Sequence, residues 1–169
     1  MTREERFEAL AREVIDPVRR FLARRTDADT AEDVLSETLL VLWRRFDDVP
    51  DNALPWAYGV ARGCLQNAER SRRRQDRVAA KLAGQPVEPH PTGTDPRLAD
   101  ALGRLPERDR ELLRLWAWEQ LSPAEIGAVL DMTPNAASIR LHRAKGKLLD
   151  ELRKAGSAAG HEGAEGRPS

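Results

Sequence analysis

The sequence predicts an all-α protein made of two small helical domains that a flexible linker joins. Apolar residues recur at helical spacing in both halves of the chain, and no segment alternates in the manner of a β-strand. Residues 84–96 contain four prolines and two glycines, a composition that does not form a packed element. A chain of 169 residues accommodates two such modules. We therefore expect domains at 1–83 and 97–155, the linker at 84–96, and a disordered tail at 156–169, where small and charged residues dominate.

Two helices are expected at the start of the first domain. Residues 4–24 carry apolar side chains at helical spacing, and Pro17 is expected to bend or split this helix because proline removes one backbone hydrogen bond. Thr30 and Asp33 match a capping box, in which a hydroxyl is followed three residues later by a carboxylate. This pattern predicts a second, strongly apolar helix that ends near Phe46.

The next elements follow from composition and periodicity. Residues 47–52 combine acids with a proline and lack periodicity, which predicts a loop. A third helix is expected over 53–81, and its second half is rich in arginine. Beyond the linker, the pattern predicts helices over 96–103 and 106–120.

The following stretch has the pattern of a helix-turn-helix. Ser122 and Glu125 form a second capping box, with proline at the first helical position. Gly127 offers a spot without a side chain, where another helix could cross closely. Asp131 suits the left-handed backbone of a short turn, and Thr133 caps the next helix. Two helices joined by a three-residue turn form the motif that many proteins use to bind DNA.

The second helix of this motif has an inward and an outward stripe. At 100° per residue, the apolar stripe consists of Ala137, Leu141, Ala144 and Leu148. The outward face opposite it consists of Asn135, Ile139, His142 and Arg143, with Ser138 at its edge and Arg140, Lys145 and Lys147 on its flanks. Outward residues of a docked helix-turn-helix contact the edges of DNA base pairs, and basic residues on the flanks contact phosphates. Taken alone, the basic cluster could also be a solvated cationic surface near the end of a helix, where positive charges favour the helix dipole.

Composition argues against several other classes of protein. The formal net charge is zero because one acidic segment and two basic segments offset each other. No apolar run approaches the roughly 20 residues of a membrane span, and the N-terminus lacks a secretory signal, so we expect a cytoplasmic protein. Cys64 has no thiol partner, and the three histidines are far apart, which argues against a metal site. No nucleophile–base pattern is visible, so we expect neither an enzyme nor a bound cofactor or small-molecule substrate.

Two segments carry a family resemblance. The region that opens with LPERDRELL and ends with RLHRAKGKL resembles the promoter-binding C-terminal domain of bacterial sigma factors. The segment AEDVLSETLLVLWRRFDDVPDNALPWAYGVARGCLQNAERSRRR resembles their other conserved domain, which binds RNA polymerase and the melted promoter element. The likeness covers roughly 7–152 without the linker, as in the extracytoplasmic-function group. It implies a signal-responsive sigma factor whose partners are core RNA polymerase, promoter DNA and an anti-sigma factor.

The resemblance also implies roles for residues of the first domain. The polymerase-binding set is Asp33, Glu37, Leu40 and Trp43, although Leu40 and Trp43 could equally lie in the core. The set implied for the minus-ten strand is Trp56, Arg62, Arg70, Arg72, Arg73 and Arg74, although an arginine-rich helix end is often simply solvated.

The sequence departs from the family pattern at three positions. Gly63 stands where an asparagine often occurs near the extruded base, and Asp131 stands where the turn often has glycine. Ile139 stands on the outward face, where an apolar side chain can contact a thymine methyl group, so the upstream promoter element is expected to be atypical.

Two other functions are compatible with these patterns. The first is a helix-turn-helix regulator that binds DNA as a dimer without polymerase, although no dimer surface or sensor domain is visible. The second is an interaction protein whose partner masks both domains, a role that would not need a capped DNA-reading helix.

Overall fold

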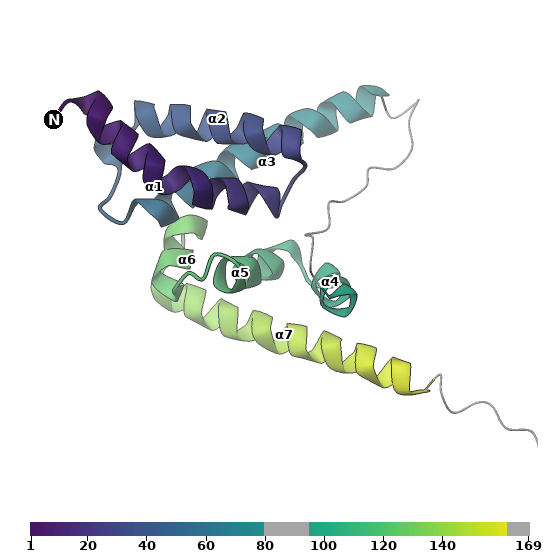
Figure 1. The fold of residues 1–169 in the computed structure, drawn as a ribbon. Coiled ribbons are helices and arrows are strands. Elements are labelled where there is room, and N and C mark those ends of the chain that lie inside the picture. The colour runs from purple at the N-terminus through teal and green to yellow at the C-terminus, as the bar shows by residue number, and fades with distance from the viewer. Residues whose placement is uncertain (80–94, 162–169) are drawn as a thin grey trace, which may run out of the picture. The chain divides into compact units, whose positions relative to one another are not determined.

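Helices form all of the regular structure in the parts of the chain that the computed structural model describes, residues 1–79 and 95–161 (Figure 1). Seven α-helices and one short 3₁₀ turn occur within these ranges, and no strand does. The all-α prediction is confirmed. The chain divides into two compact units, one built on α1–α3 and the other on α4, α5, most of α6, and α7. The predicted linker falls almost entirely outside the described residues.

The first unit packs three helices, α1 (Arg3–Ala23), α2 (Ala28–Arg44) and α3 (Ala53–Ala79), each against the other two. The 3₁₀ turn, Phe46–Asp48, follows α2. Phe21 and Leu42 are fully buried between these helices, and the Phe21 ring stacks on Tyr58 with centroids 5.1 Å apart. The burial of apolar side chains from all three helices holds the unit together.

The first helix corrects one expectation. α1 runs through Pro17 without interruption and begins with a capping box between Thr2 and Glu5. Val14, Val18 and Phe21 are buried on the same helix. Burying each such side chain stabilises the fold by about 1.5–3 kcal/mol, which together exceeds the roughly 3 kcal/mol cost of an interior proline. Tertiary packing therefore overrides the local signal.

The start of the second helix also differs from the prediction. The cap of α2 is Asp27, whose carboxylate accepts the Thr30 backbone N–H at 2.9 Å, so the helix begins at Ala28. Thr30 lies inside the helix and is not its cap, so the capping box expected at Thr30 and Asp33 is wrong. An aspartate three residues before the expected cap takes the capping role and accepts a backbone N–H that lies one turn earlier.

The second unit consists of α4 (Pro96–Gly103), α5 (Glu107–Ala117), α6 (Pro123–Leu130) and α7 (Pro134–His161). α7 packs against both α4 and α5. α5 is three residues shorter at its end than expected, because the chain leaves the helix before Gln120, which has a positive φ of 56°.

The C-terminal end of α7 contradicts part of the predicted tail. The helix continues to His161, so the expectation of disorder is wrong for residues 156–161. Once a helix is formed, each further residue adds one backbone hydrogen bond, and the small residues here do not stop that propagation. Residues 162–169 of the predicted tail lie outside the described part of the chain.

Candidate nucleic-acid interface

The helix-turn-helix corner has the caps that the sequence predicts. The Ser122 hydroxyl accepts the Glu125 N–H at 3.2 Å, and the Glu125 carboxylate accepts the Ser122 N–H at 3.1 Å. Asp131 adopts the left-handed conformation, with φ 56° and ψ 55°. The Thr133 hydroxyl accepts the Ala136 N–H at 3.1 Å and so caps α7. The two helices therefore have ends that local hydrogen bonds define.

Gly127 has a different role from the one expected. A Cβ atom at this position would lie 2.4 Å from the backbone oxygen of Met132, a distance that side chains do not tolerate. The Met132 N–H also donates to the Gly127 carbonyl at 3.0 Å. The glycine thus allows the turn itself to fold back on α6, and the close neighbour is turn backbone instead of a crossing helix.

The outward face of α7 is exposed and the opposite stripe is buried, as predicted. Ala137, Leu141 and Ala144 are buried, and Leu148 is half-buried. Every member of the outward face is exposed, including Ile139, whose exposed fraction is 44%. The periodicity therefore oriented the helix correctly.

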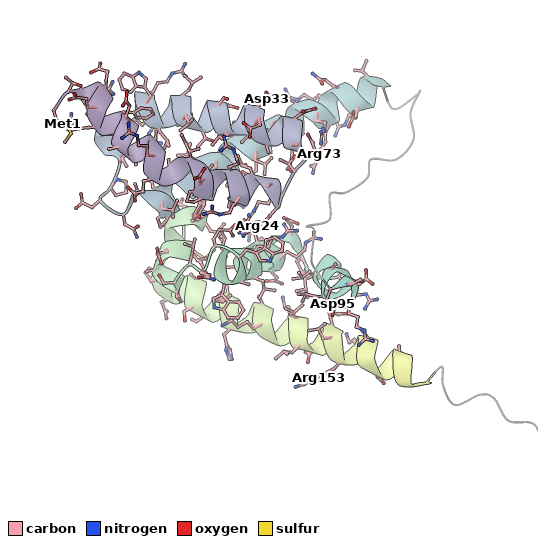
Figure 2. All side chains as sticks on the ribbon, in the orientation of Figure 1. Met1, Arg24, Asp33, Arg73, Asp95 and Arg153 are labelled. Carbon is pink, nitrogen blue, oxygen red and sulfur yellow. The ribbon has the colours of Figure 1, made fainter. Side chains whose placement is uncertain are left out.

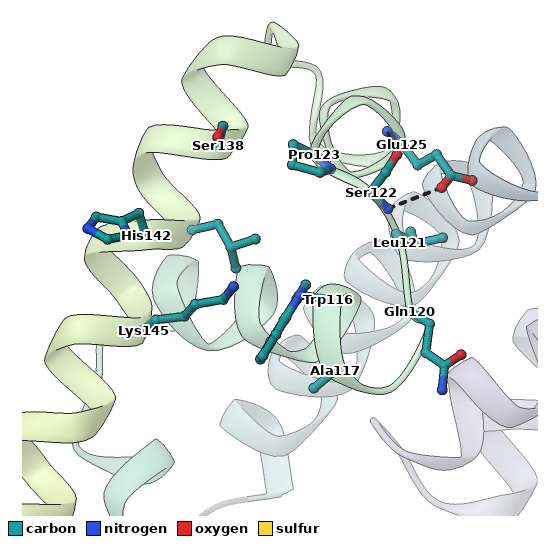
Figure 3. A pocket seen from close by; sticks show the side chains of 11 residues that line it. Trp116, Ala117, Gln120, Leu121, Ser122, Pro123, Glu125, Ser138, His142 and Lys145 are labelled. Carbon is teal, nitrogen blue, oxygen red and sulfur yellow. Dashed lines mark hydrogen bonds between the residues drawn. The ribbon is translucent and has the colours of Figure 1, made fainter.

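The basic residues on and beside this face, Arg140, Arg143, Lys145 and Lys147, differ in their surroundings. Lys147 Nζ lies 2.8 Å from the Asp109 carboxylate of α5. Lys145 Nζ lies 3.8 Å from the centre of the Trp116 ring, at the pocket shown in Figure 3. Arg140 and Arg143 are exposed and make no ion pair with any residue that the structure describes. The sequence showed the basic cluster but not these partners, which lie on another helix.

The pocket beside α7 was not predicted. It has a volume of about 870 Å³ and lies between the end of α5, the start of α6 and α7 (Figure 3). Trp116 and Leu141 contribute apolar surface, and Ser138, His142 and Lys145 contribute polar groups from α7. No local sequence pattern marks such a hollow, because its walls come from three helices.

In the first unit, three of the four residues implied for polymerase binding form one exposed stripe on α2. Asp33, Glu37 and Leu40 are spaced four and three residues apart, and all three are exposed (Asp33 is labelled in Figure 2). Leu40 has an exposed fraction of 54%, which is high for a leucine. Acidic groups beside an exposed apolar side chain are suited to contact with a basic protein surface.

The fourth residue, Trp43, is packed within the unit. Its ring meets the edge of Phe7 at a centroid distance of 5.1 Å, and the Arg3 guanidinium lies 4.2 Å from the ring centre. The Arg3 side chain also donates to the Trp43 carbonyl at 2.9 Å. Trp43 is half-buried, so its main contacts are with α1.

The residues implied for the minus-ten strand are spread along α3. Trp56 and Arg62 are half-buried near its start, and the Arg45 guanidinium lies 5.2 Å from the Trp56 ring. The exposed set near its other end is Arg70, Arg73 and Arg74, of which Arg73 is labelled in Figure 2. More than two helical turns separate the two groups, so α3 presents them as an extended track and not as one cluster.

Arg72 has a partner in its own unit. Its guanidinium lies 2.6 Å from the Asp27 carboxylate and 3.3 Å from the Thr30 hydroxyl. The backbone N–H of Thr30 and the Arg72 side chain hold the pKa of Asp27 well below its usual range. One carboxylate thus caps α2 and ties it to α3. The pattern of residues around Asp27 gave no sign of this pairing, because Arg72 is 45 residues away.

This pairing predicts a pH-dependent effect on stability. Because the pKa of Asp27 is lower in the folded state, its carboxylate stabilises the fold above the unfolded pKa of about 3.9, and this stabilisation is lost as the pH falls through the folded pKa. We expect the difference in unfolding free energy between wild type and Asp27→Asn to be constant from pH 7 to about pH 5 and to shrink below about pH 4. Chemical denaturation at several pH values measures it.

Asp27→Ala provides the matched control for the cap. Asparagine keeps an oxygen that accepts the Thr30 N–H, whereas alanine does not, so Asp27→Ala should be less stable than Asp27→Asn by about 1 kcal/mol. A difference between wild type and Asp27→Asn that is the same at pH 3 and pH 7 would contradict the charged pairing with Arg72.

No group of three metal-ligating side chains occurs within the described ranges. None of the helices there is both long and apolar enough to cross a membrane. Cys64 is buried, and that burial raises the pKa of its thiol.

Both parts of the chain are similar to known proteins. Residues 96–148 match the family model "Sigma-70, region 4", and residues 7–75 match "Sigma-70 region 2". RNA polymerase sigma factor CarQ of Myxococcus xanthus is 32% identical over 158 residues, which cover 88% of this chain and 90% of CarQ. ECF RNA polymerase sigma factor SigL of Mycobacterium tuberculosis is 31% identical over 139 residues, which cover 77% of this chain and 78% of SigL.

Solved structures share the fold. The sigma factor RpoE of Bartonella quintana, in complex with the anti-sigma factor NepR, matches with a TM-score of 0.66 at 21% identity, over 88% of this chain and 98% of the other. CnrH, in complex with the cytosolic domain of CnrY, matches with a TM-score of 0.60 at 23% identity, over 89% and 90% of the two chains. At these identities the likeness concerns the fold.

Proposed function

Because this chain belongs to the sigma-70 family of RNA polymerase sigma factors, in its extracytoplasmic-function group, we propose that it directs core RNA polymerase to specific promoters in the cytoplasm. It is a specificity subunit and not a catalyst. The observation that carries the proposal is the outward face of α7, whose members are all exposed on a capped helix-turn-helix. Arg143 on this face and Arg140 on its flank make no ion pair in the described chain.

The second unit is proposed to bind the minus-thirty-five duplex. The residues proposed to contact base edges are Asn135, Ser138, Ile139, His142 and Arg143. Arg140 on the flank is proposed to contact a phosphate, as is Lys145 if its ammonium leaves the Trp116 ring. Hydrogen bonds at the caps and the close turn at Gly127 support this role, since they hold α7 at a defined angle to α6.

The first unit is proposed to bind polymerase and the melted minus-ten strand. The stripe of Asp33, Glu37 and Leu40 is proposed as the polymerase contact, and Trp43 as a residue that supports it from beneath through its packing on α1. The exposed arginines near the end of α3 are proposed to hold the phosphates of the opened strand, with Trp56 and Arg62 closer to the extruded base. Arg72, which is bound to Asp27, is proposed to hold α3 in place.

An anti-sigma factor is a further proposed partner. Both structural relatives named above were solved as complexes with a second protein, and for RpoE that protein is called an anti-sigma factor. The α2 stripe and the outward face of α7 are both exposed in this chain. A partner that covers these surfaces would keep the protein inactive until a signal arrives.

Transcription by purified core RNA polymerase tests the proposal. We expect the polymerase to transcribe a promoter library from defined start sites with the chain present, and not with the chain absent. The aligned start sites should share elements near minus ten and minus thirty-five. If the chain instead binds a palindromic DNA site as a dimer and has no effect on polymerase, the chain is a polymerase-independent regulator.

A further inference from the structure

The ion pair between α5 and α7 involves a basic residue that sequence alone assigns to DNA. Lys147 Nζ lies 2.8 Å from Asp109 Oδ2. The Asp109 side chain is only 15% exposed, whereas the Lys147 side chain is 54% exposed. The carboxylate is therefore largely enclosed by its own unit, and the lysine is the more accessible member of the pair.

Asp109 occupies a fixed position at the start of α5. It lies in the first turn of α5, where the helix dipole stabilises a negative charge. α5 packs along α7, so the carboxylate faces α7 from a fixed position. If Lys147 moved to a phosphate, the carboxylate would be left largely buried and without its cation, which is unfavourable.

The position of Lys147 along α7 also separates it from the outward face. Lys147 is twelve residues after Asn135, which corresponds to about 18 Å along the helix axis. The major groove is about 12 Å wide, so the first two to three turns of α7 fill it. Lys147 lies one turn beyond Arg143, where α5 is its neighbour.

We propose that Asp109 is a positioning residue that limits DNA affinity by holding Lys147 on α5. The pair remains closed when the second unit binds DNA, so Lys147 contributes no phosphate contact. This inference rests on the proposed function and concerns the strength of the DNA contact. A sigma factor with weak intrinsic DNA affinity remains dependent on polymerase for promoter binding, since the two weakly binding units act together only in the complex.

The salt dependence of DNA binding tests the proposal. The full chain is titrated against a fluorescent mixed-sequence duplex between 50 and 200 mM salt, since each phosphate contact contributes about 0.9 to the slope of log affinity against log salt. We expect Lys147→Ala to leave the slope unchanged. We expect Asp109→Asn to raise the slope by about 0.9, which is roughly a 3.5-fold larger loss of affinity over this range. The double variant should return to the wild-type slope.

Two further variants serve as controls. Glu107→Gln removes an acid from the same turn of α5, but Glu107 pairs with Arg110 at 2.6 Å and with Arg114 at 3.5 Å, not with α7. If Glu107→Gln raises the slope as much as Asp109→Asn does, the effect is one of general charge and the proposal is overturned. Arg140→Ala removes an unpaired flank arginine and should lower the slope by about 0.9.

The remaining outcomes separate this inference from the proposed function. If the single variant Lys147→Ala lowers the slope, Lys147 contacts a phosphate and the inference is wrong. The proposal that α7 binds DNA is not affected by that result. If Arg140→Ala lowers the slope and Asp109→Asn leaves it unchanged, the inference is also wrong. If neither Arg140→Ala nor Arg143→Ala affects DNA binding, α7 is not the DNA-binding helix. The proposed DNA-binding function of α7 and this inference are then both wrong.

Discussion

Reversing both acidic charges on the α2 stripe, Asp33→Arg with Glu37→Arg, is expected to weaken the binding of core RNA polymerase by roughly a hundredfold. Both side chains are exposed, and neither forms an ion pair within the described chain. If this stripe meets a basic surface of polymerase, two attractive contacts become repulsive, and such like-charge contacts cost several kcal/mol. A loss of about 3 kcal/mol corresponds to roughly a hundredfold weaker binding.

A matched charge reversal on α1 controls for the change in net charge. Glu8→Arg with Glu13→Arg alters the same number of charges at exposed positions on another helix. The i,i+4 pair between Glu8 and Arg12 is exposed and contributes little to stability. Pull-down of core polymerase should fail for the α2 variant and succeed for the α1 variant, at equal helicity by circular dichroism. Equal retention of both variants would show that α2 is not the polymerase contact.

The second large effect is expected at Arg143 on the outward face of α7. Arginine binds the O6 and N7 atoms of guanine with two parallel hydrogen bonds, and Arg143 is exposed with no ion pair in the described chain. Arg143→Ala should therefore weaken promoter binding by about 1–3 kcal/mol and relax the preference at one base pair. The measurement compares holoenzyme binding to a transcribed promoter and to its single-base variants in the minus-thirty-five element.

Arg140→Ala is the matched control, because it removes the same side chain from the flank of the same helix. It should weaken binding to every sequence by a similar factor, as expected for a phosphate contact. Should Arg143→Ala behave in the same uniform way, Arg143 contacts only phosphate, and α7 lies in the groove with a different rotation about its axis.

The features that sequence predicted correctly are local ones. The capping box at Ser122 and Glu125 and the left-handed turn at Asp131 each depend on residues a few positions apart. The inward stripe of α7 follows from helical periodicity alone. Such patterns are encoded within a few turns of one helix, so they can be recognised before any tertiary contact is known.

The features that sequence missed depend on distant residues. Arg72 pairs with Asp27, 45 positions away, and Lys147 pairs with Asp109, 38 positions away. No local pattern distinguishes these basic residues from Arg140, which makes no ion pair in the described chain. The predicted bend or break at Pro17 was wrong for the same reason, because the packing that keeps α1 continuous comes from α2 and α3. An interpretation from composition alone therefore overestimates how many basic residues of a cluster are available to bind DNA phosphates.

The close turn at Gly127 has a consequence for how such a protein evolves. Any side chain at this position would collide with the Met132 backbone, so a substitution here is expected to disrupt the corner whatever the DNA target is. Residues on the outward face bear no such constraint, because substitutions of exposed side chains usually change stability by less than about 0.5 kcal/mol. Gene duplicates can therefore diverge at Asn135, Ser138 or Ile139 and acquire new promoters, while the corner that orients α7 is inherited intact.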